Sequence, residues 1–315
     1  MPIKFAIVMD PPNQLNPVKD SSLAMLEQAQ ARNWETYYIN PYSLAYKQSA
    51  FAECFPIKLQ LNQEDWYTLD EPQTLDIGMM DIIIMRVDPP FNMSYIYATY
   101  LLELAEKQGA LVVNRPQSLR DANEKLFTLQ FPDCCAPTLV ASDQKSLKAF
   151  HLEQGDIIVK PLDGMGGASI FRLKENDPNI SVIFETMTDY GTTPIIAQRF
   201  IPEISKGDKR ILLIDGEPIP YSLARIPAKG ETRGNLAAGG SGVGLELTDR
   251  DRWICQQVGP KLKEMGLSFV GIDVIGDYLT EINVTSPTCI RELDKIFDLN
   301  ISKTLLDALE NKLQK

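Results

Sequence analysis

The sequence is poor in histidine, and this limits the chemistry that it can perform. Its 315 residues contain one histidine, His151. A Ser-His-Asp triad and a His-ligated zinc centre both depend on imidazole groups, so a chain with one histidine offers little support for either kind of site. No cysteine belongs to a CxxC pair, and we interpret all five as reduced thiols, mostly buried: Cys54, Cys134, Cys135, Cys255 and Cys289.

The chain also lacks an excess of positive charge and long apolar runs. It has 42 acidic residues against 31 basic ones, which gives a formal net charge of -11. Nucleic acids and anionic membranes bind basic surfaces, so the charge argues against both as partners. No run approaches the length of a transmembrane helix, and the apolar segment at residues 3–9 is too short for a signal peptide. We therefore expect a cytoplasmic protein.

What is present is an ordinary globular composition, 44% hydrophobic, in a chain long enough for two or three domain-sized units. In the first third, strand patterns at residues 3–9, 34–39, 81–85 and 110–114 alternate with helix patterns at 20–32 and 94–107. This order predicts a parallel, doubly wound sheet. Residues 54–69 fit either a hairpin or an extension of the sheet edge.

Arg86 directly follows the strand at residues 81–85. In parallel sheets ligands bind beyond the carboxyl ends of the strands, which makes Arg86 a candidate substrate contact. A surface arginine in an ordinary loop is the alternative, and the pattern alone leaves both open.

A glycine-rich loop, Gly164 to Gly167, joins two strand patterns within residues 156–172. Its backbone N–H groups are suited to phosphates, and Lys160 at the end of the first strand is suited to add a positive charge. The loop has neither the Walker A spacing nor a following helix, and a plain turn is the alternative. Upstream, residues 118–131 predict a helix that carries Lys125.

The segment 226–246 is rich in glycine and has no apolar periodicity, which is typical of a linker or of an active-site lid. We favour a lid, because the segment lies between predicted strands and carries Arg233. Just before it, Arg210 and Arg225 flank a predicted hairpin that turns at residues 215–216. After it, residues 248–265 predict a helix with Thr248 as its N-cap.

Residues 269–291 contain two alternating segments around a turn signal at Gly276, the pattern of a β-hairpin. A two-residue turn would set Glu281 against Ile272. A three-residue turn, residues 276–278, sets Val274 beside Thr280 and Asp273 opposite Glu281, and keeps the apolar face intact, so we predict it.

That register gathers Asp273, Glu281 and Asn283 on one face. Like charges repel unless something neutralises them, and two carboxylates with an amide oxygen suit Mg²⁺ bound together with substrate phosphates. A solvated polar face on an edge hairpin is the alternative reading.

Taken in order, these segments resemble one family over nearly the whole chain. The resemblance lies in MRVDPPF, YIYATYLLE, NRPQSLRDANEKLF, DGMGGAS, AQRFI, GDKR, SLARIP, ETRGNLAAGG and TEINVTSPT. This combination resembles the bacterial-type glutathione synthetases, which are ATP-grasp ligases.

The resemblance implies an α/β and α+β fold in which an N-terminal doubly wound domain precedes a two-lobed ATP-grasp domain. The expected boundaries are residues 1–122, a first lobe at 123–200 and a second lobe at 201–315, with the lid loop at 226–242.

The resemblance also implies a role for each candidate residue. Lys125, Lys160, Gly164, Met165, Gly166 and Gly167 would bind the ATP phosphates, while the main chain of Gln198, Arg199, Phe200 and Ile201 would hold the adenine and Asp208 the ribose. Asp273, Glu281 and Asn283 would bind Mg²⁺ or Mn²⁺; Arg86, Ser286, Pro287 and Thr288 would meet the dipeptide; Arg210, Arg225 and Arg233 would surround the reacting groups.

The implied reaction joins γ-L-glutamyl-L-cysteine to glycine and converts ATP to ADP and phosphate through an acyl phosphate. The family further implies a homo-oligomer, a homotetramer, whereas the expectation of no nucleic-acid or membrane partner rests on the charge and the lack of long apolar runs. One alternative is another ATP-grasp ligase acting on a related peptide or amino acid. A non-catalytic ATP-binding regulator is the other, and it is disfavoured because every ligand residue and the lid are present.

Overall fold

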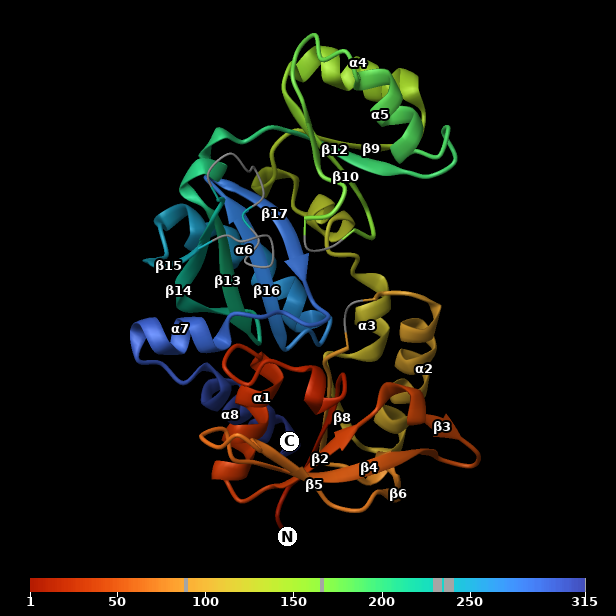
Figure 1. Ribbon diagram of the computed structural model, residues 1–315, viewed down its shortest axis with the longest axis vertical. Coiled ribbons are helices and arrows are strands. Elements are labelled where there is room, and N and C mark those ends of the chain that lie inside the picture. The colour runs from red at the N-terminus through yellow and green to blue at the C-terminus, as the bar shows by residue number, and fades with distance from the viewer. Residues whose placement is uncertain (88–89, 165–166, 229–233, 235–240, 315) are drawn as a thin grey trace.

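The computed structural model of the chain describes residues 1–87, 90–164, 167–228, 234 and 241–314. Three sheets with their helices follow one another along the longest axis of the molecule (Figure 1). The N-terminal unit occupies one end, the first lobe of the second half occupies the other, and the second lobe lies between them. Among the described residues, no helix is long and apolar enough to cross a membrane.

The N-terminal unit is built on a sheet with the strand order β3-β4-β2-β1-β7-β8, and β5 and β6 also pair with β4. Its strands are β1 (Lys4–Val8), β2 (Glu35–Ile39), β3 (Ala45–Tyr46), β4 (Ala50–Leu59), β5 (Tyr67–Leu69), β6 (Gln73–Asp76), β7 (Ile82–Met85) and β8 (Leu111–Val113). The pairs β1–β2, β1–β7 and β7–β8 are parallel, as predicted, whereas β4 adds an antiparallel edge.

Helices cover both faces of this sheet. Successive side chains of a strand point to opposite faces, and the apolar runs of β1 therefore need cover on both sides. Ala6 and Val8 pack with α2 (Met93–Gln108), whereas Phe5 and Ile7 pack with α1 (Ser21–Ala31) and α8 (Ile301–Leu313). The cap predicted for the first helix is present, since the Asp20 side chain accepts a hydrogen bond from Leu23 N.

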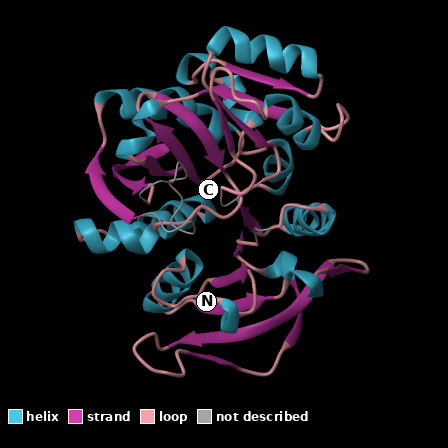
Figure 2. Cartoon of the chain, turned by 45° about the horizontal axis from the view of Figure 1, so that its top comes forward, coloured by secondary structure: helices cyan, strands magenta, loops and turns pink. Residues whose placement is uncertain are grey.

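The first lobe is a four-stranded sheet with the order β11-β10-β12-β9, and one of its faces is covered by two helices (Figure 2). Its elements are β9 (Thr138–Ala141), α4 (Gln144–Gln154), β10 (Ile157–Pro161), β11 (Phe171–Leu173), α5 (Ile180–Met187) and β12 (Ile195–Arg199). Ile157 and Val159 point into the core with Phe184 of α5. The neighbouring side chains, Ile158 and Lys160, therefore point away from the helices.

The second lobe is a five-stranded antiparallel sheet with the order β15-β14-β13-β16-β17. Its elements are β13 (Asp208–Ile214), β14 (Glu217–Ile226), β15 (Ser241–Glu246), α6 (Asp249–Glu264), β16 (Phe269–Ile275), β17 (Tyr278–Asn283) and α7 (Ile290–Phe297). Ile211 and Leu213 pack with α6, whereas Leu212 and Ile214 pack with α7 and α8. On this second face the other end of β13, with Asp208 and Arg210, is left open.

Two local predictions differ from the structure. The helix expected at 118–131 is broken into α3 (Pro116–Asp121) and a 3₁₀ turn at Leu126–Gln130. The break lies at Asn123, whose side-chain oxygen accepts hydrogen bonds from the main chain of Lys125 and Leu126 and so competes with the helical bonds. In addition, the end of the glycine-rich segment pairs with β14 as the edge strand β15. The other 3₁₀ turns are Pro12–Gln14, Pro41–Ser43, Ile77–Met79, Pro132–Cys134 and Pro202–Lys206.

Candidate active site

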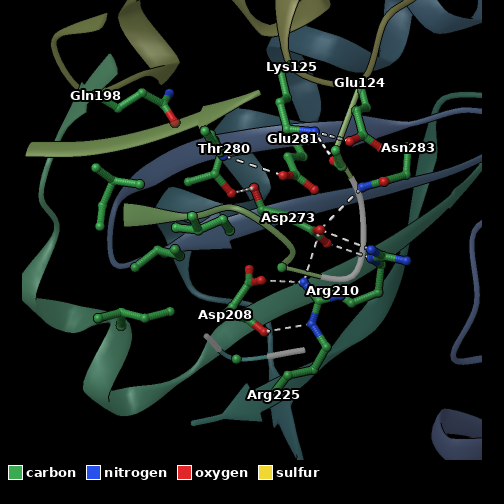
Figure 3. A pocket seen from close by; sticks show the side chains of 18 of the residues that line it. Glu124, Lys125, Gln198, Asp208, Arg210, Arg225, Asp273, Thr280, Glu281 and Asn283 are labelled. Carbon is green, nitrogen blue, oxygen red and sulfur yellow. Dashed lines mark hydrogen bonds and ion pairs between the residues drawn. The ribbon is translucent and has the colours of Figure 1, made fainter. Parts of the chain in front are cut away.

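A cavity of about 360 Å³ lies between the sheets of the two lobes. Ile158, Lys160 and Gln198 line it from the first lobe, and the open end of the second-lobe sheet provides the opposite wall (Figure 3). The cavity extends to the segment between β17 and α7, which contributes Thr285 to Cys289.

Strand register places the charged residues of the second lobe in one group. On β13, Arg210 pairs with Asp273 of β16, and Asp273 pairs in turn with Glu281 of β17. Two residues earlier, Asp208 pairs with Arg225 of β14. Because residues opposite each other in a sheet share a face, these side chains all face the cavity.

Asp273 is the centre of this group and is buried. Its Oδ1 accepts from Arg210 Nε at 2.5 Å, and its Oδ2 lies 2.9 Å from both Arg210 Nη2 and Arg225 Nη2. Asn283 Nδ2 also donates to Oδ2, at 3.2 Å. Burial alone would raise the pKa of Asp273, but the two guanidinium groups outweigh it and hold that pKa well below its ordinary value.

The lack of a side chain at Gly271 makes room for Arg210. At Gly271, on the same face of β16, a Cβ atom would lie 2.9 Å from Arg210 Cδ and 3.0 Å from Pro287 Cβ. Glycine thus lets the arginine lie flat between β16 and the segment that follows β17.

The pKa of Asp208 is shifted in the opposite direction to that of Asp273. It pairs with Arg225, but its Oδ1 is buried without a hydrogen-bond partner among the described residues. Burial therefore dominates and raises the pKa of Asp208 to about 6, even though Arg225 opposes this shift. The same burial lowers the pKa of Arg225, but its two carboxylate neighbours outweigh it and the net shift is upward.

The predicted pairing of Asp273 with Glu281 is confirmed, but the predicted turn is wrong. Ile275 pairs with Tyr278, so the turn has two residues. A register shift next to Asp273 leaves Thr280 as a bulge, and its hydroxyl donates to Asp273 O at 3.1 Å. The shorter turn pairs Val274 with Leu279 instead of Thr280. Because Thr280 is then the extra residue of the bulge, Asp273 still pairs with Glu281.

The acidic face of the hairpin provides the donors that a hard cation needs. Within the described part of the chain, no three His, Cys, Asp or Glu side chains are grouped to hold a metal by themselves. Asp273, Glu281 and Asn283 instead offer two carboxylates and an amide oxygen, a set that suits Mg²⁺ when a ligand adds phosphate oxygens. Glu281 is the more accessible carboxylate, because four donor groups from three side chains already fill the lone pairs of Asp273.

Two buried lysines lie across from this face. Lys160 Nζ is 3.4 Å from Glu281 Oε1, so the ion pair joins the two lobes. Lys125 pairs with Glu124 and donates to Gly164 O at 2.6 Å. Gly164 and Gly167 line the same cavity. Met165 and Gly166 of the predicted loop lie outside the described residues, as does Arg233 of the predicted lid.

Arg86 is not a surface residue, since only 5% of it is exposed. Its Nε donates to Ser22 Oγ at 3.1 Å and its Nη2 to Pro287 O at 3.0 Å. Ser286 Oγ in turn donates to Arg86 O at 3.2 Å. Arg86 therefore holds the segment that carries Ser286, Pro287 and Thr288 at one end of the cavity, and its contact with a substrate stays a prediction.

Several lining residues were not predicted from the sequence. Glu124 and Thr280 contribute polar atoms to the cavity, and Ile158 and Ile275 contribute apolar surface. Ile158 could have been found from the alternation of β10, because it points to the same side as Lys160. The position of Thr280 depends on the bulge, for which the sequence carries no clear signal.

The overall architecture is shared with a solved structure described as ATP-grasp ligase PsnB complexed with a phosphomimetic variant of a minimal precursor, Mg and ADP. The TM-score is 0.65 at 19% identity, and all of both chains is covered. This likeness shows that the chain shares the fold of that structure.

Sequence comparison identifies the family. The model of the prokaryotic glutathione synthetase N-terminal domain matches residues 3–120, and the model of the ATP-grasp domain of the same enzymes matches residues 124–298. The glutathione synthetase of Vibrio vulnificus (strain YJ016) is 58% identical over 100% of this chain and 99% of its own length. That of Pseudomonas aeruginosa is 57% identical over 99% of both chains.

The chain belongs to the prokaryotic glutathione synthetase family. It is an ATP-dependent ligase of glutathione biosynthesis.

Proposed function

We propose that this cavity joins γ-L-glutamyl-L-cysteine to glycine, with Mg²⁺ as the metal and ATP as the co-substrate. The observation that carries the proposal is the ion pair of Lys160 with Glu281, 3.4 Å apart across the two lobes. The Lys160 ammonium can bind phosphate oxygens, and the Glu281 carboxylate can bind a metal ion. The two groups face each other where a triphosphate would lie.

The chemistry requires two displacements. A carboxylate oxygen of the dipeptide attacks the γ-phosphorus, the bond from that phosphorus to the β-phosphate oxygen breaks, and ADP leaves. The glycine nitrogen then attacks the acyl carbon, the carbon–oxygen bond breaks, phosphate leaves and the nitrogen loses a proton. Both steps depend on orientation and charge neutralisation more than on a dedicated base, so the lack of histidine is no obstacle.

The phosphate end of the site would use Lys125, Lys160 and the loop from Gly164 to Gly167. Both lysines are buried and are held by carboxylates, Lys125 by Glu124 and Lys160 by Glu281. Buried ammonium groups bind phosphate oxygens strongly, because little water competes for them.

Asp273, Glu281 and Asn283 would hold the metal. When bound, Mg²⁺ supplies charge neutralisation and alignment of the phosphates; Mn²⁺ has similar ligand preferences and is a substitute. Arg210 and Arg225 keep Asp273 ionised, and a cation that binds Asp273 directly would replace one of its four present donors.

The nucleoside would lie along residues 198–201, with its base against Ile158 and Ile275. Asp208 supports this orientation, because its unpaired Oδ1 can accept a hydrogen bond from a ribose hydroxyl.

The dipeptide would lie by Ser286 to Thr288, which Arg86 fixes in place. Arg210 and Arg225 border this end of the cavity as well as the metal ligands, so they would stabilise negative charge on the reacting carboxylate. Arg233 and the lid at 226–242 would complete the enclosure and protect the acyl phosphate from water.

A substrate panel tests the assignment. Purified protein is given ATP and Mg²⁺ with pairs of carboxylates and amines, and ADP release and the peptide product are measured together. We expect γ-glutamylcysteine with glycine to give glutathione at the highest kcat/KM. A higher kcat/KM for a different dipeptide or amine would instead support another ATP-grasp ligase.

We also infer a homo-oligomer, most simply a homotetramer, and a reducing cytoplasmic location. Helix α2 lies on the outer side of the N-terminal unit (Figure 1). It supports association, because Met93, Tyr97 and Tyr100 expose more than half of their surface and their spacing puts them on one stripe of the helix. Free cysteines at all five positions support the location. Light scattering of Tyr97→Asp against the unmodified protein tests the contact, and an unchanged mass would refute it.

A further inference from the structure

A hydrogen bond between Arg199, which lines the cavity, and Tyr278 joins the two lobes. Arg199 Nη2 donates to Tyr278 Oη at 2.8 Å, and the guanidinium carbon is 5.4 Å from the centre of the tyrosine ring. Arg199 is the last residue of β12 in the first lobe, and Tyr278 is the first residue of β17 in the second. The bond therefore crosses from one sheet to the other.

The second lobe holds its side of this contact firmly. Arg250 of α6 donates through Nε to Asp277 O and through Nη2 to Asp133 O, both at 2.9 Å. Its guanidinium carbon is 4.2 Å from the ring centre of Trp253. The hairpin tip is thus fixed to α6 and to the linker that leads into the first lobe, and Tyr278 cannot shift without the strand behind it.

Arg199 and Tyr278 connect two parts of the site that are distant from each other. Arg199 belongs to the segment proposed to hold the adenine, but its side chain is directed to Tyr278. Glu281, a proposed metal ligand, follows Tyr278 by three residues on the same strand, a distance of roughly 10 Å. The strand is hydrogen-bonded to β16 along its length, so it transmits position from one end to the other.

We propose that Arg199 and Tyr278 are positioning residues that couple nucleotide binding to metal binding. This inference rests on the proposed function, since it takes the adenine and metal sites from it. When a nucleotide and a metal are bound together, the nucleotide spans both lobes, and the contact fixes the spacing between the adenine segment and Glu281. A nucleotide without metal still contacts Ile275 and Asp208 of the second lobe, but it gains nothing from the position of Glu281, so its affinity depends little on the contact.

The test is the affinity for ADP with and without Mg²⁺, measured by isothermal titration on the full-length protein. In Tyr278→Phe the ring stays and the hydroxyl is lost. We expect ADP binding in saturating Mg²⁺ to weaken about tenfold, which is about 1.4 kcal/mol. We expect ADP binding in the presence of a chelator to stay within twofold. Arg199→Lys should show the same pattern, which guards against a defect peculiar to one variant.

Two controls separate coupling from general damage. Tyr190→Phe removes the same hydroxyl from a side chain that is 80% exposed in the first lobe, and it should change neither affinity. Arg172→Gln disturbs the adenine segment within the first lobe, where the Arg172 guanidinium carbon is 3.5 Å from the Phe200 ring centre and its nitrogens bind Asp156. It should weaken ADP by the same factor with and without Mg²⁺.

The outcomes distinguish the inference from its foundation. Equal weakening of both affinities in Tyr278→Phe, or no weakening of either, would overturn the coupling while leaving the proposed function in place. An unmodified protein whose ADP affinity is the same with and without Mg²⁺ would overturn the proposed metal site, and the coupling with it.

Discussion

Replacing Glu281 with glutamine separates the metal site from the stability of the fold. The Glu281 side chain is 23% exposed, and its ion pair with Lys160 is 3.4 Å long. A single pair with this exposure contributes no more than about 1 kcal/mol, and the glutamine oxygen can still accept from the lysine. The thermal midpoint should therefore fall by no more than about 4 °C.

Turnover should respond far more strongly than stability. A ligand carboxylate supports several kcal/mol of charge stabilisation in the transition state through the metal. Since each 1.4 kcal/mol is a factor of ten, kcat/KM should fall at least about 100-fold. The assay is coupled ADP release with γ-glutamylcysteine and glycine, alongside thermal unfolding of the same samples. Glu217→Gln, at an exposed strand end, is the matched control. Near-normal activity in Glu281→Gln would refute the metal assignment.

Three further predictions concern the dipeptide, the lid and pH. Arg86→Gln should raise the KM for the dipeptide at least about tenfold with little change in the KM for ATP, because Arg86 holds Pro287 and Ser286 in place. Steady-state kinetics measure both constants, and an equal rise in both would count against this role. Deleting residues 230–240 should uncouple ATP hydrolysis from ligation, measured as phosphate released per glutathione formed, and a ratio that stays at one would exclude the lid. The pKa of Asp208 is raised from 3.8 to about 6, so the folded state binds the proton of this carboxyl more tightly than the unfolded state does. The free energy of unfolding should therefore fall by about 3 kcal/mol as the pH rises from about 4 to about 6. Urea unfolding should show a smaller decline over that range in Asp208→Asn, and an identical pH profile would contradict the assignment.

Much of the fold was accessible from periodicity. The strands of the N-terminal sheet and their parallel order follow from apolar runs that alternate with amphipathic helices. The Asp273–Glu281 pair followed from the need to keep Ile272 on the apolar face of the hairpin. The turn length could not be derived in the same way, because a bulge at Thr280 compensates for a shorter turn and leaves the pairing unchanged.

The placement of the arginines could not be predicted from the sequence. Arg210 and Arg225 were expected around the reacting groups, which stays a prediction, and the structure brings both into contact with Asp273. That arrangement depends on the pairing of β13 with β14 and β16, which are separate segments of the chain. It also depends on burial, which makes an unpaired Asp273 carboxylate costly and so draws two cations to it.

The most direct test of the account is a crystal structure with an ATP analogue and Mn²⁺, in which anomalous scattering locates the metal. We predict a peak within bonding distance of Asp273, Glu281 and Asn283 and of the nucleotide phosphates, with Lys160 on the opposite side of those phosphates. A nucleotide bound outside the cleft between the two sheets, or a metal peak without contact to the hairpin, would contradict the account.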